Sequence, residues 1–327
     1  MNAPLLEVSA LCVSYPGRRG PVPAVRDASF RLARGASLGI VGESGSGKST
    51  LALALLRLPG VAGQVTGGAA LFDGRDLITM PEPELRQWRG RRLAMILQDP
   101  LHSLNPLFTN GDQIAEAPMV HEHLSRPAAL TRAGALLRAV RIADPAQRLA
   151  EYPHQLSGGM RQRVAGAIAL SCSPDLLIAD EPTTALDPTV QAQYLDLLNS
   201  LRAEHGFCLI LISHDINVIR RTCDDIAVMY AGRIVEQGPT AQVLAAPAHP
   251  YTHALIGALP LPGRRAGTLA VIGGHPPDAT DLPAGCAFHP RCGRASDRCL
   301  RELPPPAPVA TGQTAACFHP WPAPVAR

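Results

Sequence analysis

The feature that most constrains this 327-residue chain is a glycine-rich octapeptide that holds its only lysine among 30 basic residues. Lys48 lies in Gly42-Glu43-Ser44-Gly45-Ser46-Gly47-Lys48-Ser49, between an apolar run at 36–41 and a helix-like run at 49–58. A strand, a glycine-rich loop and a helix in this order form a phosphate-binding loop, because loop N–H groups and the helix N-terminus bind phosphate. A compact ammonium reaches between phosphates where a planar guanidinium fits poorly. The chain is therefore predicted to bind a nucleoside triphosphate, with Ser49 on Mg²⁺.

The composition is that of a globular protein, with 46% hydrophobic and 17% charged residues. A net charge of only +3 gives no electrostatic reason to expect a nucleic-acid partner. No apolar run approaches the roughly 20 residues that a membrane span needs, and 1–4 lacks the basic start of a secretory signal. We expect a cytosolic chain, unless a membrane partner holds it.

Short apolar runs alternate with helix-like stretches over the first 250 residues, which is the pattern of an α/β sheet. The clearest strand candidates are Ser37–Val41, Leu93–Leu97, Leu176–Ala179, Cys208–Ile212 and Ile226–Met229.

Two regions depart from that alternation. Residues 112–156 are rich in Ala, Leu and Arg at helical spacing, as in 128–140, and contain no strand candidate, so we expect an inserted helical subdomain at about 105–170. After Pro247 proline becomes dense and helical periodicity fades. The sequence thus predicts a nucleotide-binding domain over 1–250 and a loop-rich extension over 251–327.

Two carboxylates end the apolar run at 176–179. A buried strand that delivers an acid at its carboxyl end places a Mg²⁺ ligand beside the phosphates in nucleotide-binding α/β folds. Asp180 is predicted to hold the metal, directly or through water, and Glu181 to activate the attacking water as general base.

A second glycine-rich helix start follows at Leu156-Ser157-Gly158-Gly159-Met160-Arg161-Gln162-Arg163. Ser157 is suited to an N-cap, and two glycines leave the helix N-terminus bare for an anion. Together with the phosphate loop and Asp180-Glu181, this segment resembles the signature motif of the ABC-transporter ATPases. That resemblance covers about 5–250 and implies a P-loop NTPase fold: a RecA-like α/β core with an N-terminal β subdomain and an inserted helical subdomain.

The resemblance also implies roles for single residues. Gln98 resembles the glutamine that links Mg²⁺ and the attacking water to the transport-coupling surface, and His214 resembles the histidine on the γ-phosphate. Asp187, in Ala185-Leu186-Asp187, resembles the loop that crosses the dimer interface, and Tyr15 the aromatic residue that stacks on adenine. ATP would contact these positions: Gly42, Ser44, Gly45, Ser46, Gly47, Lys48, Ser49 and Thr50 in one chain, with Ser157, Gly158 and Gly159 from the opposed ATPase domain.

Two further segments resemble the oligopeptide, dipeptide and nickel importer family. They are 98–106, a loop extension, and 249–260, which opens the C-terminal extension of that family. Met160 and Arg161 favour the D-type of the two ATPase types that such importers pair. The resemblance implies a Mg²⁺-dependent ATP hydrolase that powers import of di- or oligopeptides, peripheral on the cytoplasmic face of the inner membrane.

The partners implied are a second, related ATPase chain, two transmembrane permease subunits and an extracytoplasmic peptide-binding protein. Two alternatives remain: the ATPase of a nickel or metal-chelate importer, and a non-transport ATPase that acts on a soluble partner. The carried solute is not readable from the sequence, because the ATPase subunit does not touch it.

Four of the eight cysteines crowd into the extension with the spacing Cys286-x5-Cys292-x6-Cys299-x17-Cys317. In a reducing cytosol such a group favours a metal site over disulfides. Four thiolates suit an iron–sulfur cluster or tetrahedral zinc, and paired C-x2-C spacings typical of structural zinc sites are absent. The segment resembles the cysteine-rich tail of dipeptide and oligopeptide importer ATPases, which implies a [4Fe–4S] cluster. Zinc, with His289 or His319 as substitute ligands, is the alternative.

Overall fold

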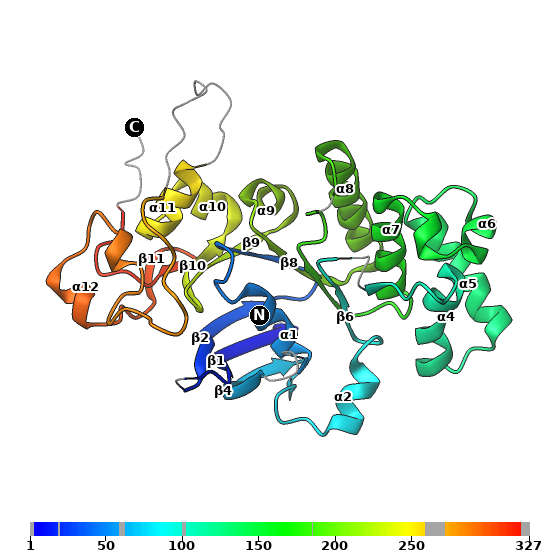
Figure 1. Ribbon diagram of the computed structural model, residues 1–327, viewed down its shortest axis with the longest axis horizontal. Coiled ribbons are helices and arrows are strands. Elements are labelled where there is room, and N and C mark those ends of the chain that lie inside the picture. The colour runs from blue at the N-terminus through cyan, green and yellow to red at the C-terminus, as the bar shows by residue number, and fades with distance from the viewer. Residues whose placement is uncertain are drawn as a thin grey trace. The chain divides into compact units, whose positions relative to one another are not determined.

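The chain forms two compact units. Figure 1 shows the computed structural model as a ribbon coloured along the chain. The first unit comprises 1–5, 32–37 and 79–212, and the second unit comprises 6–31, 38–78 and 213–327. The structure describes residues 3–18, 20–58, 63–99, 103–184, 186–258 and 272–321.

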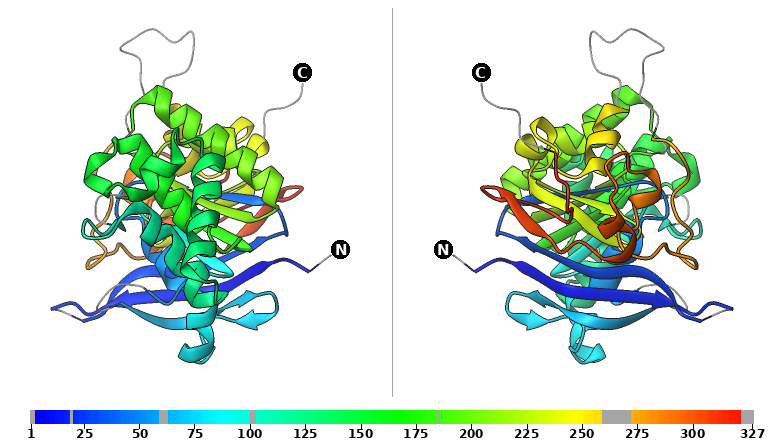
Figure 2. Two further views of the ribbon diagram at one scale, coloured as in Figure 1. Left: turned by 90° about the vertical axis from the view of Figure 1, so that its right-hand side faces the viewer. Right: turned by 90° about the vertical axis from the view of Figure 1, so that its left-hand side faces the viewer.

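In the second unit, a four-stranded sheet has the order β2-β1-β4-β5. Its strands are β1 (Leu6–Tyr15), β2 (Val22–Leu32), β4 (Gln64–Phe72) and β5 (Arg75–Asp76). The long strands β1 and β4 run antiparallel (Figure 2). Leu6 of β1 lies opposite Phe72 of β4. In β1 the buried side chains alternate as Leu6 and Val8 and then, after the register shift that begins between Ser9 and Cys12, as Leu11 and Val13. This sheet is the N-terminal β subdomain that the family resemblance implies.

The second unit also contains a sheet segment in the order β11-β12-β10-β9-β3. Its strands are β3 (Ser37–Val41), β9 (Asp225–Tyr230), β10 (Arg233–Pro239), β11 (Ala307–Ala310) and β12 (Gln313–Ala315). Strands β3 and β9 are parallel, and β10 pairs antiparallel with both β9 and β12. The C-terminal residues thus add two strands to this sheet, β12 beside β10 and β11 beside β12, which the prediction of a loop-rich extension missed.

The helical segments of the second unit are mostly short. They are α1 (Lys48–Leu55), α9 (Ile216–Thr222), α10 (Thr240–Ala245), α11 (Pro250–Gly257), η2 (His289–Arg291) and α12 (Asp297–Arg301). Helix α1 begins at the lysine of the glycine-rich loop, close to the predicted start at 49, and ends three residues before the predicted end at 58.

In the first unit, three parallel strands have the order β8-β7-β6. They are β6 (Leu93–Ile96), β7 (Leu176–Asp180) and β8 (Cys208–Ser213). All residues of β7 and β8 are buried, which explains their continuous apolar runs, since both faces of a parallel sheet are covered. Together with β3 and β9, these strands confirm all five strand predictions to within one residue at each end.

Helices make up most of the rest of the first unit. They are α2 (Glu82–Trp88), α4 (Asn110–His121), α5 (Arg126–Ala139), α6 (Pro145–Ala150), η1 (Pro153–Gln155), α7 (Gly158–Ala169) and α8 (Pro188–His205). Helix α4 packs against α5, α6 and α7 (Figure 1). The described part of 103–170 contains helices and no strand, as the sequence predicts. The domain boundary at 250 and 251 stays a prediction.

Candidate functional site

The glycine-rich loop of the second unit has a backbone that only glycine tolerates at two positions. Gly47, which precedes α1, has φ 97°. A Cβ atom on Gly47 would lie 2.3 Å from the carbonyl oxygen of Ala24, and one on Gly42 would lie 2.2 Å from that of Met229. Both distances are shorter than van der Waals contact allows, so glycine lets this backbone approach its neighbours closely.

The only lysine is folded back onto its own loop. The Lys48 side chain is buried, and Nζ donates hydrogen bonds to the carbonyl oxygens of Gly42 at 2.8 Å and Glu43 at 2.9 Å. These carbonyls are the acceptors that phosphate oxygens would replace. Ser46 Oγ is also buried and has no hydrogen-bond partner among the described residues, which leaves a polar atom available to a ligand.

Tyr15 and His214 belong to the same unit as the loop. Tyr15 ends β1, and its hydroxyl lies 3.5 Å from Thr50 Oγ1 in the first turn of α1. His214 is exposed and follows β8, and Asp215 beyond it caps α9 by accepting the Asn217 N–H at 2.8 Å. The stacking of Tyr15 on adenine and the contact of His214 with phosphate stay predictions.

The two predicted carboxylates lie at the end of β7 in the first unit. Asp180 is 4% exposed, and Glu181 adopts φ 44°, a left-handed conformation that is rare outside glycine. The Glu181 N–H donates to the Ile212 carbonyl at 2.9 Å, which holds this conformation. Residues in such sparsely populated conformations cluster at functional sites.

The Glu181 carboxylate accepts hydrogen bonds from the side chains of Gln98 and Thr184. Its Oε2 accepts from Gln98 Nε2 at 3.3 Å and from Thr184 Oγ1 at 2.9 Å. The structure thus brings together two of the residues predicted to act on the attacking water. It adds Thr184, which the sequence analysis missed although it lies in the same turn as Glu181.

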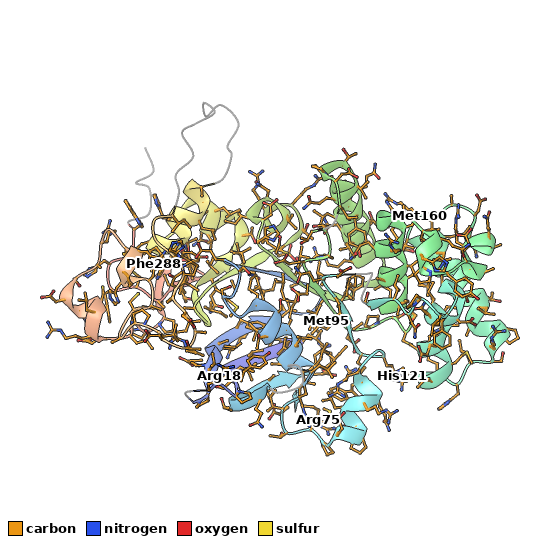
Figure 3. The ribbon with its side chains drawn as sticks, in the orientation of Figure 1. Arg18, Arg75, Met95, His121, Met160 and Phe288 are labelled. Atoms are coloured by element: carbon orange, nitrogen blue, oxygen red, sulfur yellow. The ribbon has the colours of Figure 1, made fainter. Side chains whose placement is uncertain are left out.

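The second glycine-rich helix start caps α7 as predicted. Ser157 Oγ accepts the Met160 N–H at 3.3 Å. Figure 3 labels Met160, in the first turn of α7. A Cβ atom on Gly158 would meet nothing within 4 Å, whereas one on Gly159 would lie 3.0 Å from Val190 Cγ1. Gly158 therefore leaves open space in the first turn, where the N–H groups can bind an anion.

Asp187 is the N-cap of α8, because its Oδ1 accepts from the N–H groups of Thr189 at 3.1 Å and Val190 at 3.0 Å. Its neighbour Ala185 and residues 100–102 of the predicted loop extension lie outside the described residues.

The predicted site residues are divided between the two units. The first unit contains Gln98, Ser157, Gly158, Gly159, Asp180, Glu181 and Asp187. The second unit contains Tyr15, Gly42, Ser44, Gly45, Ser46, Gly47, Lys48, Ser49, Thr50 and His214.

The four clustered cysteines line one cavity of about 10 Å³ in the second unit. Their cavity is also lined by His249, Phe288 and His319. Burial raises the pKa values of the Cys286 and Cys292 thiols, and it raises that of Cys317 to about 11. A bound cation would reverse this shift, since thiols ligate metals as thiolates.

The cavity has room for about one water molecule. Within the described residues, no three His, Cys, Asp or Glu side chains are grouped as ligands of one metal ion. This geometry does not support the predicted [4Fe–4S] cluster or its zinc alternative, which stay predictions that rest on the four thiols and their spacing.

No helix within the described ranges has both the length and the apolar character needed to cross a membrane.

Comparisons with known proteins agree with this set of motifs. Residues 25–184 match the family model "ABC transporter", and residues 235–299 match "Oligopeptide/dipeptide transporter, C-terminal region". The chain is 46% identical over 316 residues to the oligopeptide transport ATP-binding protein OppD of Salmonella typhimurium, covering 97% of this chain and 94% of that protein. It is also 46% identical over 296 residues to OppD of Haemophilus influenzae, covering 90% of this chain and 91% of that protein.

Solved structures give the same family. The dimeric post-hydrolysis structure of the ATP-binding cassette MJ0796 with ADP and Pi aligns with a TM-score of 0.65 and 26% identity, over 72% of this chain and 98% of that one. The structure of cbiO1 from Clostridium perfringens, part of the ABC transporter complex cbiONQ, aligns with a TM-score of 0.63 and 28% identity. The alignment covers 75% of this chain and 92% of that one. By its motifs, its fold and these similarities, the chain belongs to the ABC transporter family of ATP-binding proteins, among the members that carry the oligopeptide/dipeptide transporter C-terminal region.

Proposed function

We propose that this chain is the ATP-hydrolysing subunit that powers an importer of oligopeptides or dipeptides. The proposal is supported by the match of residues 235–299 to the C-terminal region of such transporters and by the 46% identity to OppD proteins over nearly the whole length. The energy source is Mg²⁺-dependent transfer of the ATP γ-phosphoryl group to water.

The observation that carries the hydrolytic part of the proposal is the hydrogen bond between Gln98 and Glu181. A general base must lie within hydrogen-bond reach of the water that it deprotonates, and its carboxylate must be oriented. The Gln98 amide and the Thr184 hydroxyl both donate to Glu181 Oε2, which orients the carboxylate. We assign Glu181 as the base and Gln98 and Thr184 as the groups that orient it.

The phosphates are assigned to the second unit. Lys48 moves its ammonium from the carbonyls of Gly42 and Glu43 to the β- and γ-phosphates, and the loop N–H groups bind the same oxygens. Ser49, Gln98 and Asp180 are the oxygen donors that would hold Mg²⁺, which neutralises charge on the transferred group. His214 would contact the γ-phosphate and Tyr15 the adenine ring.

We propose that the active form is a head-to-tail pair of ATPase domains. In this pair Ser157, Gly158 and Gly159 of one chain bind the ATP held by the phosphate loop of the other, and Asp187 lies at the interface. The dimeric MJ0796 structures support the pairing. We assign a related second ATPase chain, two permease subunits and a peptide-binding protein as partners, with the complex on the cytoplasmic face of the inner membrane.

The experiment that tests the transported solute compares uptake in cells with and without the gene. Labelled dipeptide, tripeptide and nickel are each supplied, and the gene is restored as wild type or Glu181→Gln. Loss of peptide uptake that only wild type restores supports the proposal. If only nickel uptake is lost, the chain belongs to a metal importer. If uptake of dipeptide, tripeptide and nickel is unchanged while the protein hydrolyses ATP, the result favours an ATPase that acts on a soluble partner.

The four cysteines supply the basis for a second, finer proposal. We propose that Cys286, Cys292, Cys299 and Cys317 would hold a [4Fe–4S] cluster, since one cavity is lined by all four thiols and their spacing lacks C-x2-C pairs. The cluster would supply a structural centre for a segment with few regular elements.

Anaerobic purification with visible absorption and iron, sulfide and zinc analysis tests the cluster. The expected result is a brown protein with about four irons and four sulfides, both lost in Cys292→Ala. Stoichiometric zinc, or protein without metal, would exclude the [4Fe–4S] cluster. Neither result would affect the proposal that the chain is an ATPase. Cys172→Ala is the matched control, because that buried thiol lies outside the four-cysteine cavity.

A further inference from the structure

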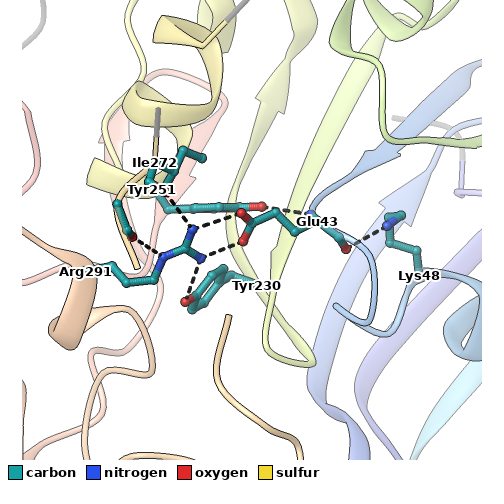
Figure 4. A network of polar contacts seen from close by, with 7 residues as sticks. Glu43, Lys48, Tyr230, Tyr251, Ile272 and Arg291 are labelled. Carbon is teal, nitrogen blue, oxygen red and sulfur yellow. Dashed lines mark hydrogen bonds and ion pairs between the residues drawn. The ribbon is translucent and has the colours of Figure 1, made fainter. Parts of the chain in front are cut away.

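An arginine of the cysteine-bearing segment reaches the phosphate loop. Arg291 lies in η2, the short turn between Cys286 and Cys292. Its Nη1 and Nη2 donate to Glu43 Oε2 at 2.7 Å and Oε1 at 3.0 Å, a bidentate pair between residues 248 positions apart (Figure 4). Glu43 is the second residue of the phosphate loop and its only acidic one. A bidentate guanidinium–carboxylate pair contributes interaction energy and also fixes the relative orientation of the two groups.

The remaining donors of Arg291 are also used. Nε donates to the Gly273 carbonyl at 2.8 Å, and Nη1 and Nη2 reach Tyr230 Oη at 3.3 Å and the Ile272 carbonyl at 3.4 Å. The Arg291 side chain is 4% exposed, against 24% for that of Glu43. The Arg291 guanidinium is buried and each of its N–H groups points at a partner, so its orientation is fixed. It can therefore hold the Glu43 carboxylate in a fixed orientation.

The backbone of Glu43 is held by the same part of the chain. Its N–H donates to Tyr251 Oη at 2.9 Å (Figure 4). Tyr251 is 0% exposed, and its ring packs on those of Tyr230 and Phe288 at centroid distances of 4.6 and 5.4 Å. The loop N–H of Glu43 is thus fixed by the region that follows residue 250.

We infer that Arg291 is a positioning residue for the phosphate loop, and that the cysteine-bearing extension is thereby a working part of the ATP site. This inference rests on the proposed function. The guanidinium neutralises the one carboxylate of a loop that has to accept a triphosphate, and it fixes Glu43 while the Tyr251 hydroxyl fixes the adjoining amide. Without Arg291, an uncompensated negative charge remains beside the bound phosphates and repels them.

The test is the dissociation constant of MgATP for the full-length chain. Wild-type binding is measured first. If the wild-type chain does not bind MgATP, the proposed function is contradicted, and so is a role of Arg291 in MgATP binding. In Arg291→Ala we expect binding about tenfold weaker, equivalent to about 1.4 kcal/mol. Arg291→Lys keeps the charge but loses the bidentate fork, so it should recover only part of that loss.

A double-mutant cycle separates charge from geometry. If Arg291 acts on the loop through Glu43, Glu43→Gln combined with Arg291→Ala should bind MgATP more tightly than Arg291→Ala alone. Hydrogen exchange of the 42–49 segment should rise in Arg291→Ala, because the amide network of the loop is loosened. Arg298→Ala is the matched control, since Arg298 is an exposed arginine of the same extension that pairs with Glu302.

A purely structural role would lower thermal stability without moving the MgATP constant. A folded Arg291→Ala that binds MgATP within twofold of wild type therefore overturns the inference. Where Arg291→Ala does not fold, Arg291→Lys decides, because it keeps the positive charge and loses the bidentate pair with Glu43. Unchanged MgATP binding and unchanged hydrogen exchange of 42–49 in Arg291→Lys would also overturn the inference.

Discussion

Gln98 Nε2 lies 3.3 Å from Glu181 Oε2, although the two residues are 83 positions apart in the chain. Gln98 follows β6, and Glu181 follows β7, and these two strands are parallel neighbours. Residues that follow adjacent parallel strands emerge at the same edge of a sheet, where α/β folds place ligands. The short apolar strands thus determine where an amide and a carboxylate meet.

Glu181→Gln should keep MgATP binding and lose steady turnover. The amide cannot accept the proton of the attacking water, and removal of a general base typically lowers the rate by about 10²–10⁴-fold. Paired measurements of MgATP binding and phosphate release check this. Glu116→Gln, an exposed change on α4, should behave as wild type, and near-normal turnover in Glu181→Gln would exclude Glu181 as the base.

Lys48 should be protected by ATP from amine-specific reagents. It is the only lysine, so reductive methylation has only two targets, Lys48 and the N-terminal amine. Protection should grow with the fraction of chain that has MgATP bound, because the ammonium is then engaged by phosphates. Mass spectrometry quantifies both sites, and the N-terminal amine is the internal control. Equal labelling of Lys48 with and without saturating MgATP would place it outside the phosphate site.

Gly158→Ala should separate turnover from folding. The new methyl group meets nothing within 4 Å, so the melting temperature should not fall. It nevertheless occupies the open first turn of α7, where we place the phosphates of the opposed chain, so hydrolysis should decrease at unchanged MgATP affinity of the isolated chain.

Gly159→Ala provides the contrast to that variant. Its methyl group would lie 3.0 Å from Val190 Cγ1, so the Val190 side chain has to move by a few tenths of an ångström, and the melting temperature should drop. Full turnover in Gly158→Ala would show that the first turn of α7 does not bind ATP.

Asp225→Asn should stabilise the protein at neutral pH. Burial, and to a lesser extent the neighbouring Asp224 carboxylate, raises the pKa of Asp225 above its ordinary value of 3.8. The folded state therefore holds this proton more tightly than the unfolded state, and stability falls as pH rises from the unfolded toward the folded pKa. Above that window the penalty is complete, and the neutral amide removes it.

The measurement for Asp225→Asn is the melting temperature at pH 7 and pH 3. The expected gain at pH 7 disappears at pH 3, where Asp225 is protonated in both states. Asp281→Asn, at an exposed position, is the matched control. A gain of equal size at both pH values would mean that the amide stabilises through contacts and not through charge.

Local pattern was sufficient for the strands and for most of the proposed ATP site. The run at 176–179 is continuously apolar because β7 is covered on both faces, and the acid that follows it needs no long-range information to be found. The same holds for the glycine-rich loop, whose function depends on backbone shape within eight consecutive residues. The positive φ of Glu181, by contrast, is stabilised by a hydrogen bond from its N–H to the Ile212 carbonyl of the neighbouring strand β8. The residues next to Glu181 in the sequence do not predict this conformation.

By itself, the sequence determined the phosphate loop, the two carboxylates, the capped α7 and the family, because each depends on residues adjacent in the chain. Only the tertiary structure decided that β12 pairs with β10, that four cysteines share a cavity, and that Arg291 reaches Glu43. The pairing of β12 with β10 and the ion pair of Arg291 with Glu43 join residues far apart in the chain, so no short period or spacing predicts them. They form because burial brings strand edges and charged side chains together, and each then needs a partner.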